Sequence, residues 1–130
     1  MKICILKETA QNEKRVALVP DVAKKLINDG FEVFIESGAG KQSDFSDEDY
    51  TGVGVTAAEA DKIIPNADII FSVKMPNIDS IKKMKAEACL IGLLNPYDNH
   101  EQLKALSENN VNAFSMELVP RSPRAQSMDV

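Results

Sequence analysis

The amino-acid sequence predicts a three-layer α/β domain, in which helices cover both faces of a mainly parallel five-stranded sheet. Short apolar runs rich in β-branched residues alternate with polar segments of helical spacing. Several of the runs are almost continuously apolar, which is typical of strands buried on both faces. Together these observations indicate a doubly wound, flavodoxin- or Rossmann-like fold. The predicted strands are residues 2–6, 31–36, 67–74, 88–94 and 111–118.

The helices are predicted from their caps and their apolar spacing. Pro20 suits a first helical turn, and Gly30 ends the helix that it starts. Ser46 is expected to cap a short acidic helix. The last helix is amphipathic, with Leu103 and Leu106 as its apolar positions. The predicted helices are residues 20–29, 47–54, 57–64, 79–86 and 99–110.

Composition limits the classes of protein to consider. The 130 residues suffice for one domain, and 44% hydrophobic with 27% charged residues is ordinary for a globular domain. A net charge of −5 argues against nucleic-acid binding. No apolar run is long enough to cross a membrane, and the N-terminus lacks the features of a secretory signal. Cys4 and Cys89 lie inside apolar runs without metal-type spacing, so we expect a reducing cytoplasmic compartment and no metal site.

The segment "ESGAGKQS" resembles a phosphate-binding loop only superficially. A Walker loop fails at Ile35 and Gln42, where glycine and Ser or Thr are required. A GxGxxG fingerprint fails at Ser43 and also follows the wrong strand. Gly38 and Gly40 are therefore interpreted as residues of a tight turn, and no GxGxxG motif is predicted in this chain.

Other apparent motifs also favour structural roles. The acidic stretch "DFSDEDY" lacks the glycine and the glutamate that a calcium loop needs, and it is interpreted as a helix cap. His100, the only histidine, is expected to be exposed in a first helical turn. No serine or cysteine has an evident base partner for triad chemistry.

Charged residues follow the first and third predicted strands. Lys7 and Glu8 come directly after residue 6, Lys74 ends the third strand, and Arg15 lies in the polar stretch before the first helix. Parallel strands place their carboxyl ends at one edge of the sheet, where α/β domains bind ligands. Two interpretations stay open: these residues contact a ligand, or they form salt bridges that support the loop.

Several phrases of the sequence, taken together, carry a family resemblance. They are "NEKRVALVP", "GFEVFIESGAG", "FSDEDY", "LIGLLNPYDN" and "VPRSPRAQSMD". The chain resembles the N-terminal domain shared by alanine dehydrogenase and the NAD-binding alpha subunit of proton-translocating NAD(P) transhydrogenase. The likeness runs over the whole chain.

Two places distinguish the branches of that family. Alanine dehydrogenases carry a proton-transferring histidine after the fourth strand, where this chain has Asn95 in "GLLNPYDN". A neutral amide cannot serve as a general acid or base near pH 7. The end of the chain resembles the loop by which the NAD-binding subunit meets the NADP-binding component. The resemblance therefore favours the transhydrogenase branch.

The resemblance implies roles for three residues of that loop. Arg121 is expected to hydrogen-bond the nicotinamide carboxamide of NAD(H), and Asp129 to orient its guanidinium. Gln126 is expected to reach toward NADP(H) on the partner component. Here Ser122 and Pro123 stand where the family usually has a β-branched or hydroxyl residue, which stiffens the loop.

The resemblance also implies how the chain is organised. Residues 1–118 are expected to form the α/β domain, and residues 119–130 to begin the Arg-Gln-Asp loop before a separate dinucleotide-binding domain. The expected partners are the NADP-binding and transmembrane components, with a homodimer of NAD-binding subunits at the cytosolic face of the inner membrane. The segment is expected to be inactive alone and to expose an apolar patch, because the family completes this domain with a later helix.

Two alternatives remain. The first is the N-terminal domain of an alanine dehydrogenase, in which Arg15 matches a carboxylate-binding arginine and Lys74 a substrate-contacting lysine. The second is a flavodoxin-like module without catalysis, although Lys7 and Glu8 do not supply the paired acidic residues that receiver modules carry after their first strand.

Overall fold

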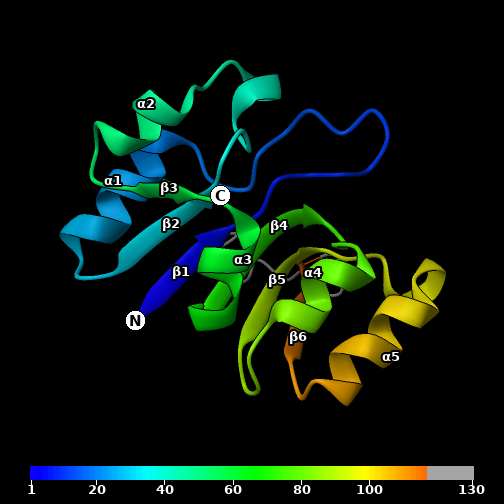
Figure 1. Ribbon diagram of the computed structural model, residues 1–130. Helices are drawn as coiled ribbons and strands as arrows, with labels where there is room; N and C mark the ends of the chain where they lie inside the picture. The colour runs from blue at the N-terminus through cyan, green and yellow to red at the C-terminus, as the bar shows by residue number, and fades with distance from the viewer. Residues whose placement is uncertain (117–130) are drawn as a thin grey trace, which may run out of the picture.

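The computed structural model describes residues 1–116, and their six strands form one parallel sheet (Figure 1). The strand order is β3-β2-β1-β4-β5-β6, and every neighbouring pair is parallel. This is the doubly wound order of dinucleotide-binding domains, in which the chain reverses its direction of winding beside β1. The strands are β1 (Lys2–Ile5), β2 (Glu32–Glu36), β3 (Thr56–Ala58), β4 (Ile69–Lys74), β5 (Cys89–Leu93) and β6 (Asn112–Ser115).

Helices pack on both faces of the sheet, which confirms the predicted α/β class and its parallel sheet. The helices α1 and α2 lie over the half formed by β1, β2 and β3, whereas α3, α4 and α5 cover the opposite face (Figure 1). None of the helices in residues 1–116 has the length and apolar character to cross a membrane. The helices are α1 (Pro20–Asn28), α2 (Asp47–Thr51), α3 (Ala60–Ile63), α4 (Ile78–Lys83) and α5 (His100–Glu108), with 3₁₀ turns η1 (Lys41–Ser43), η2 (Ile64–Asn66) and η3 (Pro96–Asp98).

The predicted count of five strands is corrected to six in the described residues. The sequence prediction places residues 57 and 58 in a helix, because the two alanines there favour helix in isolation. In the structure Thr56–Ala58 pairs with β2, with Phe34 opposite Thr56, and α3 begins only at Ala60. Pairing along the open edge of β2 thus outweighs the local helix propensity.

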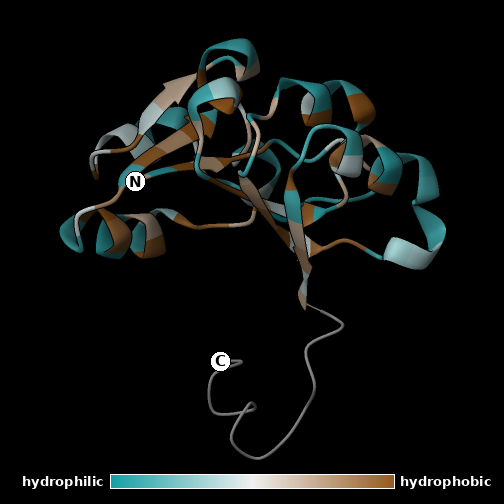
Figure 2. Cartoon of the chain, turned by 90° about the horizontal axis from the view of Figure 1, so that it is seen from below, coloured by the Kyte–Doolittle hydropathy of each residue, from teal (hydrophilic) through white to brown (hydrophobic). Residues whose placement is uncertain are grey.

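Two apolar clusters separate the layers. Ile3, Ile5 and Ile35 lie in the cluster under α1 and α2. Cys4 and Ile70 lie in the cluster under α3, α4 and α5. Successive residues of one strand thus serve opposite layers, as strand geometry requires. The colouring in Figure 2 agrees, since brown runs along the central strands and the helices mix brown with teal.

Some apolar side chains of the sheet in residues 1–116 are exposed or only partly buried. Phe71, Ile91 and Phe114 share one register row across β4, β5 and β6, on the side away from α4 and α5. Phe114 is 56% exposed, and Leu93 and Met116 beside this row are 40% and 45% exposed. We call these five residues the open face. Large contiguous apolar surfaces on soluble proteins are typical of contact sites.

Candidate functional site at the carboxyl end of the sheet

The carboxyl ends of β1 and β4 form the point at which the winding of the sheet reverses. From β1 the chain proceeds to β2 on one side, and β4 returns to pair with the other side of β1. The loops after these two strands therefore diverge and leave a crevice between them, which is where open α/β sheets bind ligands. All the charged residues that the sequence places at this edge belong to these two loops or to the end of β4.

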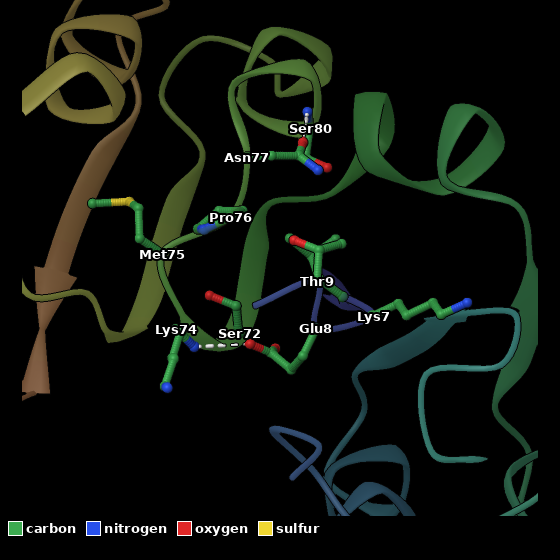
Figure 3. Close-up of a pocket in the computed structure, with 10 residues that line it drawn as sticks. Lys7, Glu8, Thr9, Ser72, Lys74, Met75, Pro76, Asn77 and Ser80 are labelled. Atoms are coloured by element: carbon green, nitrogen blue, oxygen red, sulfur yellow. Dashed lines mark hydrogen bonds between the residues drawn. The ribbon is translucent and has the colours of Figure 1, made fainter. Parts of the chain in front are cut away.

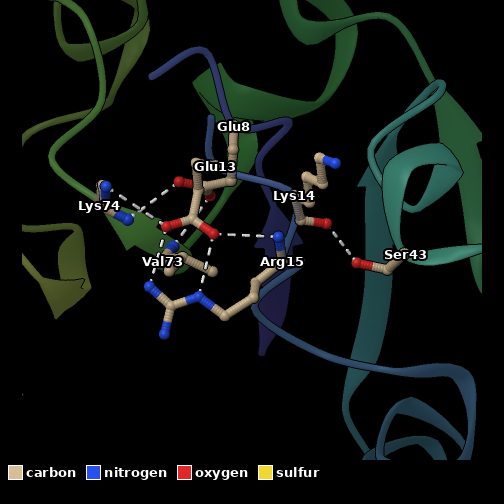
Figure 4. A network of polar contacts seen from close by, with 7 residues as sticks. All are labelled: Glu8, Glu13, Lys14, Arg15, Ser43, Val73 and Lys74. Atoms are coloured by element: carbon tan, nitrogen blue, oxygen red, sulfur yellow. Dashed lines mark hydrogen bonds and ion pairs between the residues drawn. The ribbon is translucent and has the colours of Figure 1, made fainter. Parts of the chain in front are cut away.

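Glu8 joins the two strands at this point (Figure 4). Its Oε2 accepts the backbone N–H of Val73 at 2.8 Å, and its Oε1 accepts the backbone N–H of Lys74 at 2.9 Å. Burial raises the pKa of the Glu8 carboxyl above its ordinary value, and the two amide hydrogen bonds act in the opposite direction. The side chain thus spans from the loop after β1 to the last residues of β4.

The strand β4 contains an irregularity at the same place. Phe71 pairs with Ile91 and Lys74 pairs with Leu93, so β4 advances three residues while β5 advances two. Such a bulge is rare between parallel strands and changes the direction of the side chains beyond it. Gly92 permits it, because a Cβ atom there would lie 2.2 Å from the carbonyl oxygen of Ser72.

Glu13 is the buried centre of the charged cluster, with its side chain only 4% exposed. It accepts hydrogen bonds from Nε of Arg15 at 2.9 Å, from the terminal NH2 of Arg15 at 2.8 Å and from the backbone N–H of Arg15 at 3.0 Å. The ammonium of Lys74 lies 3.6 Å from the same carboxylate. The hydrogen bonds from the Arg15 side chain are the main reason that the pKa of Glu13 falls to about 2.

Beside this cluster lies an open cleft of about 400 Å³. Arg15 and Lys74 supply its cationic wall, and Met75 and Leu93 supply apolar surface. Its far side is the turn after β5, where Asn99 donates through Nδ2 to the carbonyl oxygens of Leu94 and Asn95 at 3.0 and 2.9 Å. The remaining residues at the cleft are Ala10, Leu94, Asn95 and Asn99. A small anion or a polar planar group fits the charge of this wall.

The structure thus brings Arg15 and Lys74 together, as their positions at the ligand edge suggested. The predicted salt-bridge support of the loop is confirmed for Arg15, which binds Glu13. Both cations also face the cleft, so the two interpretations are compatible. Glu13 itself was not predicted from the sequence, although its place two residues before Arg15 was a signal. The predicted site residues Arg121, Gln126 and Asp129 lie outside the described residues.

The "ESGAG" segment forms a tight turn, as predicted. Gly38 has φ of +82°, and its N–H donates to Oδ1 of Asp47 at 2.9 Å. A Cβ atom on Gly40 would lie 2.7 Å from the buried ring of Tyr50. Ser46 caps α2 in a reciprocal capping box with Asp49, which confirms that prediction.

The sole histidine and Cys4 match their predicted structural roles, whereas Cys89, also expected to be buried, is only partly buried. His100 is exposed at the start of α5, and Cys4 is buried in β1. Burial raises the pKa of the Cys4 thiol to about 12, so it is an inert core residue. Among residues 1–116, no group of three or more His, Cys, Asp or Glu side chains is arranged to hold a metal ion.

The fold and the site define a class: a doubly wound α/β domain with a charged crevice at its switch point. Comparison with known proteins narrows this class. The family model described as "Alanine dehydrogenase/PNT, N-terminal domain" matches residues 4–130. The chain therefore belongs to this family, which confirms the resemblance seen in the sequence.

Similar proteins come from both branches of the family. A Rickettsia prowazekii protein, named as the first piece of NAD(P) transhydrogenase subunit alpha, is 41% identical over 99% of this chain and 35% of its own length. The crystal structure of transhydrogenase from Sinorhizobium meliloti has a TM-score of 0.93 at 37% identity, covering 99% of this chain and 39% of that chain. An L-alanine dehydrogenase structure has a TM-score of 0.87 at 28% identity, covering 95% of this chain and 34% of that chain. The chain thus spans about a third of the length of these relatives.

Proposed function

We propose that this chain is the first domain of the NAD-binding subunit of a proton-translocating NAD(P) transhydrogenase, which transfers hydride between NAD(H) and NADP(H). The observation that carries the proposal is the 41% identity to a transhydrogenase alpha subunit over 99% of the chain. The alanine dehydrogenase structure is more distant, at 28% identity. The presence of Asn95 where alanine dehydrogenases have a histidine supports the same branch.

Residues 1–116 have groups that match the nicotinamide end of a dinucleotide, but their loop after β1 does not match its pyrophosphate. The connection between β1 and α1 contains no glycine, so its backbone cannot approach a pyrophosphate as a GxGxxG loop does. The cleft beside Arg15 and Lys74 instead offers cations and carbonyl oxygens, which match a carboxamide or a small carboxylate. We assign the nicotinamide end of NAD(H) to this edge, and the pyrophosphate to a separate domain.

In this proposal the chain's own residues orient the reaction. The nicotinamide supplies the hydride chemistry, and Arg121 holds its carboxamide through a planar guanidinium that Asp129 keeps in place. Gln126 contacts the NADP(H) component, where an amide can both donate and accept. No acid or base is needed for hydride transfer itself, so positioning is the main contribution of the domain.

The partners follow from the same proposal. An NADP-binding component and a transmembrane component take part in the reaction, and the NAD-binding subunit forms a homodimer docked at the cytosolic face of the inner membrane. The Rickettsia relative is named as one piece of a divided alpha subunit, which supports a multi-component enzyme.

Gln126→Asn in the full-length subunit, assembled with its partners, tests the assignment. Shortening this side chain by one methylene is expected to slow hydride transfer by about a hundredfold, because small misplacements of reacting groups have effects of this size. NADH affinity, measured by fluorescence titration, is expected to stay nearly unchanged. Gln42→Asn, an exposed substitution of the same kind, is the control. A large loss of NADH affinity in Gln126→Asn would contradict the assigned role.

A second candidate is an amino-acid dehydrogenase of the alanine type. The convergence of Arg15 and Lys74 on one cleft favours it, because two cations suit a 2-oxo acid carboxylate. Alanine-dependent formation of NADH by the full-length protein would establish this function. Absence of that activity, together with NADH-dependent reduction of an NADP analogue, supports the transhydrogenase.

A further inference from the structure

We propose that Glu8 is a positioning residue, whose carboxylate takes the place of the β1 backbone beside β4 and thereby aims Lys74 into the cleft. The inference deepens the proposed function, and it rests on that function only where transhydrogenase activity is the readout. Its basis is the pattern of hydrogen bonds at the carboxyl ends of β1 and β4.

The hydrogen-bond ladder between β1 and β4 changes its donor and acceptor groups at this point. The N–H of Leu6 still donates to the carbonyl oxygen of Phe71 at 3.1 Å. Beyond it the loop after β1 leaves the sheet, and two later amides of β4, those of Val73 and Lys74, donate to the two oxygens of Glu8. A carboxylate suits this place because it offers two acceptors and no donor. Unpaired amides at a partly buried strand end would be costly.

The other side of β4 is fixed as well. The bulge between Phe71 and Lys74 brings the Ser72 carbonyl so close to Gly92 that no side chain fits there. The Ser72 hydroxyl is buried and has no hydrogen-bond partner within residues 1–116, and it lies next to Glu8 around a gap of about 10 Å³ (Figure 3). The irregular end of β4 is thus held between Gly92 on β5 and the Glu8 carboxylate.

Fixing the end of β4 also fixes the direction in which the Lys74 side chain leaves the strand. Glu8 binds the backbone N–H of Lys74, and Glu13 attracts its ammonium from 3.6 Å (Figure 4). Two carboxylates from the loop after β1 therefore restrain Lys74: Glu8 holds its backbone and Glu13 attracts its ammonium. Because Lys74 is 47% exposed and borders the cleft, its side chain would have many rotamers without this restraint.

The first test measures Lys74 directly in the full-length protein. Glu8→Gln keeps the size of the side chain but replaces one acceptor with an amide NH2, which cannot accept from either backbone N–H. Lys74 is acylated with acetic anhydride, and its rate of acylation is followed by peptide mass spectrometry. We expect this rate to rise about two- to fivefold, the factor that corresponds to loss of an exposed ion pair, here the one between Lys74 and Glu13. Lys83, which is 37% exposed and paired with Asp61, is the internal reference.

Controls separate positioning from general loosening. Glu32→Gln removes the same charge from an exposed position on β2 and is expected to leave the acylation rates of both lysines unchanged. If the acylation rate of Lys83 rises as much as that of Lys74 in Glu8→Gln, the effect is global and the inference is wrong. An unchanged Lys74 rate also overturns it. If Glu8→Gln does not fold, Glu8→Asp is measured in the same way, since its shorter side chain cannot reach both amides.

The second test uses a double-mutant cycle with Lys74→Met in the assembled transhydrogenase. If Glu8 acts through Lys74, Glu8→Gln reduces hydride transfer on the order of tenfold in the parent and has no further effect in Lys74→Met. Additive losses would contradict the inference while leaving the proposed function intact. If the parent lacks transhydrogenase activity, the proposed function fails and the acylation measurement still decides the role of Glu8.

Discussion

At the residue scale, Glu13 illustrates how a carboxylate can be buried without a net penalty. It is nearly inaccessible, yet it accepts three hydrogen bonds from Arg15 and lies beside the Lys74 ammonium. Removing Arg15 would leave the buried Glu13 carboxylate poorly compensated, which is costly because Glu13, unlike the two cations, is buried. The cluster therefore couples the stability of the loop after β1 to the geometry of the cleft.

We predict that Glu13→Gln lowers the free energy of unfolding by roughly 2 kcal/mol at pH 7, the size expected for lost charge-assisted hydrogen bonds. Urea denaturation followed by far-UV circular dichroism measures this. Glu32→Gln, on the exposed side of β2, is expected to change stability by less than about 0.5 kcal/mol. Equal effects of the two substitutions would show that the Glu13 cluster contributes little.

The lowered pKa of Glu13 also predicts how the stability of the fold depends on pH. Since the folded pKa of Glu13 is lowered from 4.5 to about 2, its contribution is present above the ordinary pKa and is lost as the pH falls toward 2. Glu8 and Glu36 act in the opposite sense, because burial raises the pKa of each and their charged forms are disfavoured in the fold. The stability difference between the parent and Glu13→Gln should therefore shrink between about pH 5 and pH 2. A constant difference over that range would refute the assignment.

The sequence places Arg15, Lys74 and Glu8 at the ligand-binding edge, but it does not reveal Glu13 or the contacts that the two carboxylates make. Arg15 and Lys74 stand at positions where α/β domains present ligand-binding groups, so strand order alone selects them. Glu13 interacts mainly with its near neighbour Arg15, and β4 also brings Lys74 to within 3.6 Å of it. The second interaction is a long-range contact that no local pattern encodes. The interaction of Glu8 with two amides depends on the bulge in β4, which is equally invisible in the sequence.

At the scale of elements, caps and apolar runs predicted most boundaries, because they are local features. The strand β1 and the Ser46 cap depend on neighbouring residues and were found. The strand β3 has only three residues and exists through pairing with β2, so its alanines indicated the wrong local structure. Val22, which has helical spacing with the apolar residues of α1, is 40% exposed, and the smaller Ala23 is buried in its place.

The turn after β2 is a second test at this scale. In Gly40→Ala the new methyl group would meet the Tyr50 ring at 2.7 Å and the Phe45 carbonyl oxygen at 2.9 Å. We expect a loss of about 1–3 kcal/mol in the free energy of unfolding, as for other overpacked sites. Gly52→Ala is the matched control, since its φ of −62° suits alanine and its Cβ atom would lie no closer than 3.1 Å to another atom, the Glu48 carbonyl oxygen. In thermal unfolding the Tm of Gly40→Ala should be clearly lower than that of Gly52→Ala. The reverse order would contradict this account of the turn.

At the scale of the whole molecule, the open face is an apolar surface to which hydrophobic molecules are expected to bind. Its five apolar residues lie on β4, on β5, on β6 and just beyond it, on the side away from α4 and α5. The sequence resemblance predicted an apolar patch of this kind, but the residues that form it could be named only from strand register. Register depends on pairings between distant segments, which sequence patterns do not specify.

We predict that residues 1–130 in isolation bind a hydrophobic dye at the open face. Phe114→Ser is expected to reduce the fluorescence of 8-anilinonaphthalene-1-sulfonate, because it removes a large apolar side chain that is 56% exposed. Tyr97→Ser, which alters a 75% exposed aromatic residue in η3, is the control and should leave the signal nearly unchanged. Equal losses in both variants would indicate nonspecific dye binding.

The proposed function divides the recognition of NADH between this domain and a separate one. Under the proposed function, Arg15 and Lys74 in the crevice face one end of the cofactor, whereas the loop after β1 contains no glycine that would let its backbone approach the pyrophosphate. Residues 1–130 alone are therefore expected to bind NADH with a Kd of roughly millimolar or weaker, measured by isothermal titration calorimetry. The full-length subunit, titrated under the same conditions, should bind far more tightly. A micromolar Kd for residues 1–130 would mean that this domain holds the pyrophosphate itself, and the assignment of that group to a separate domain would have to be abandoned.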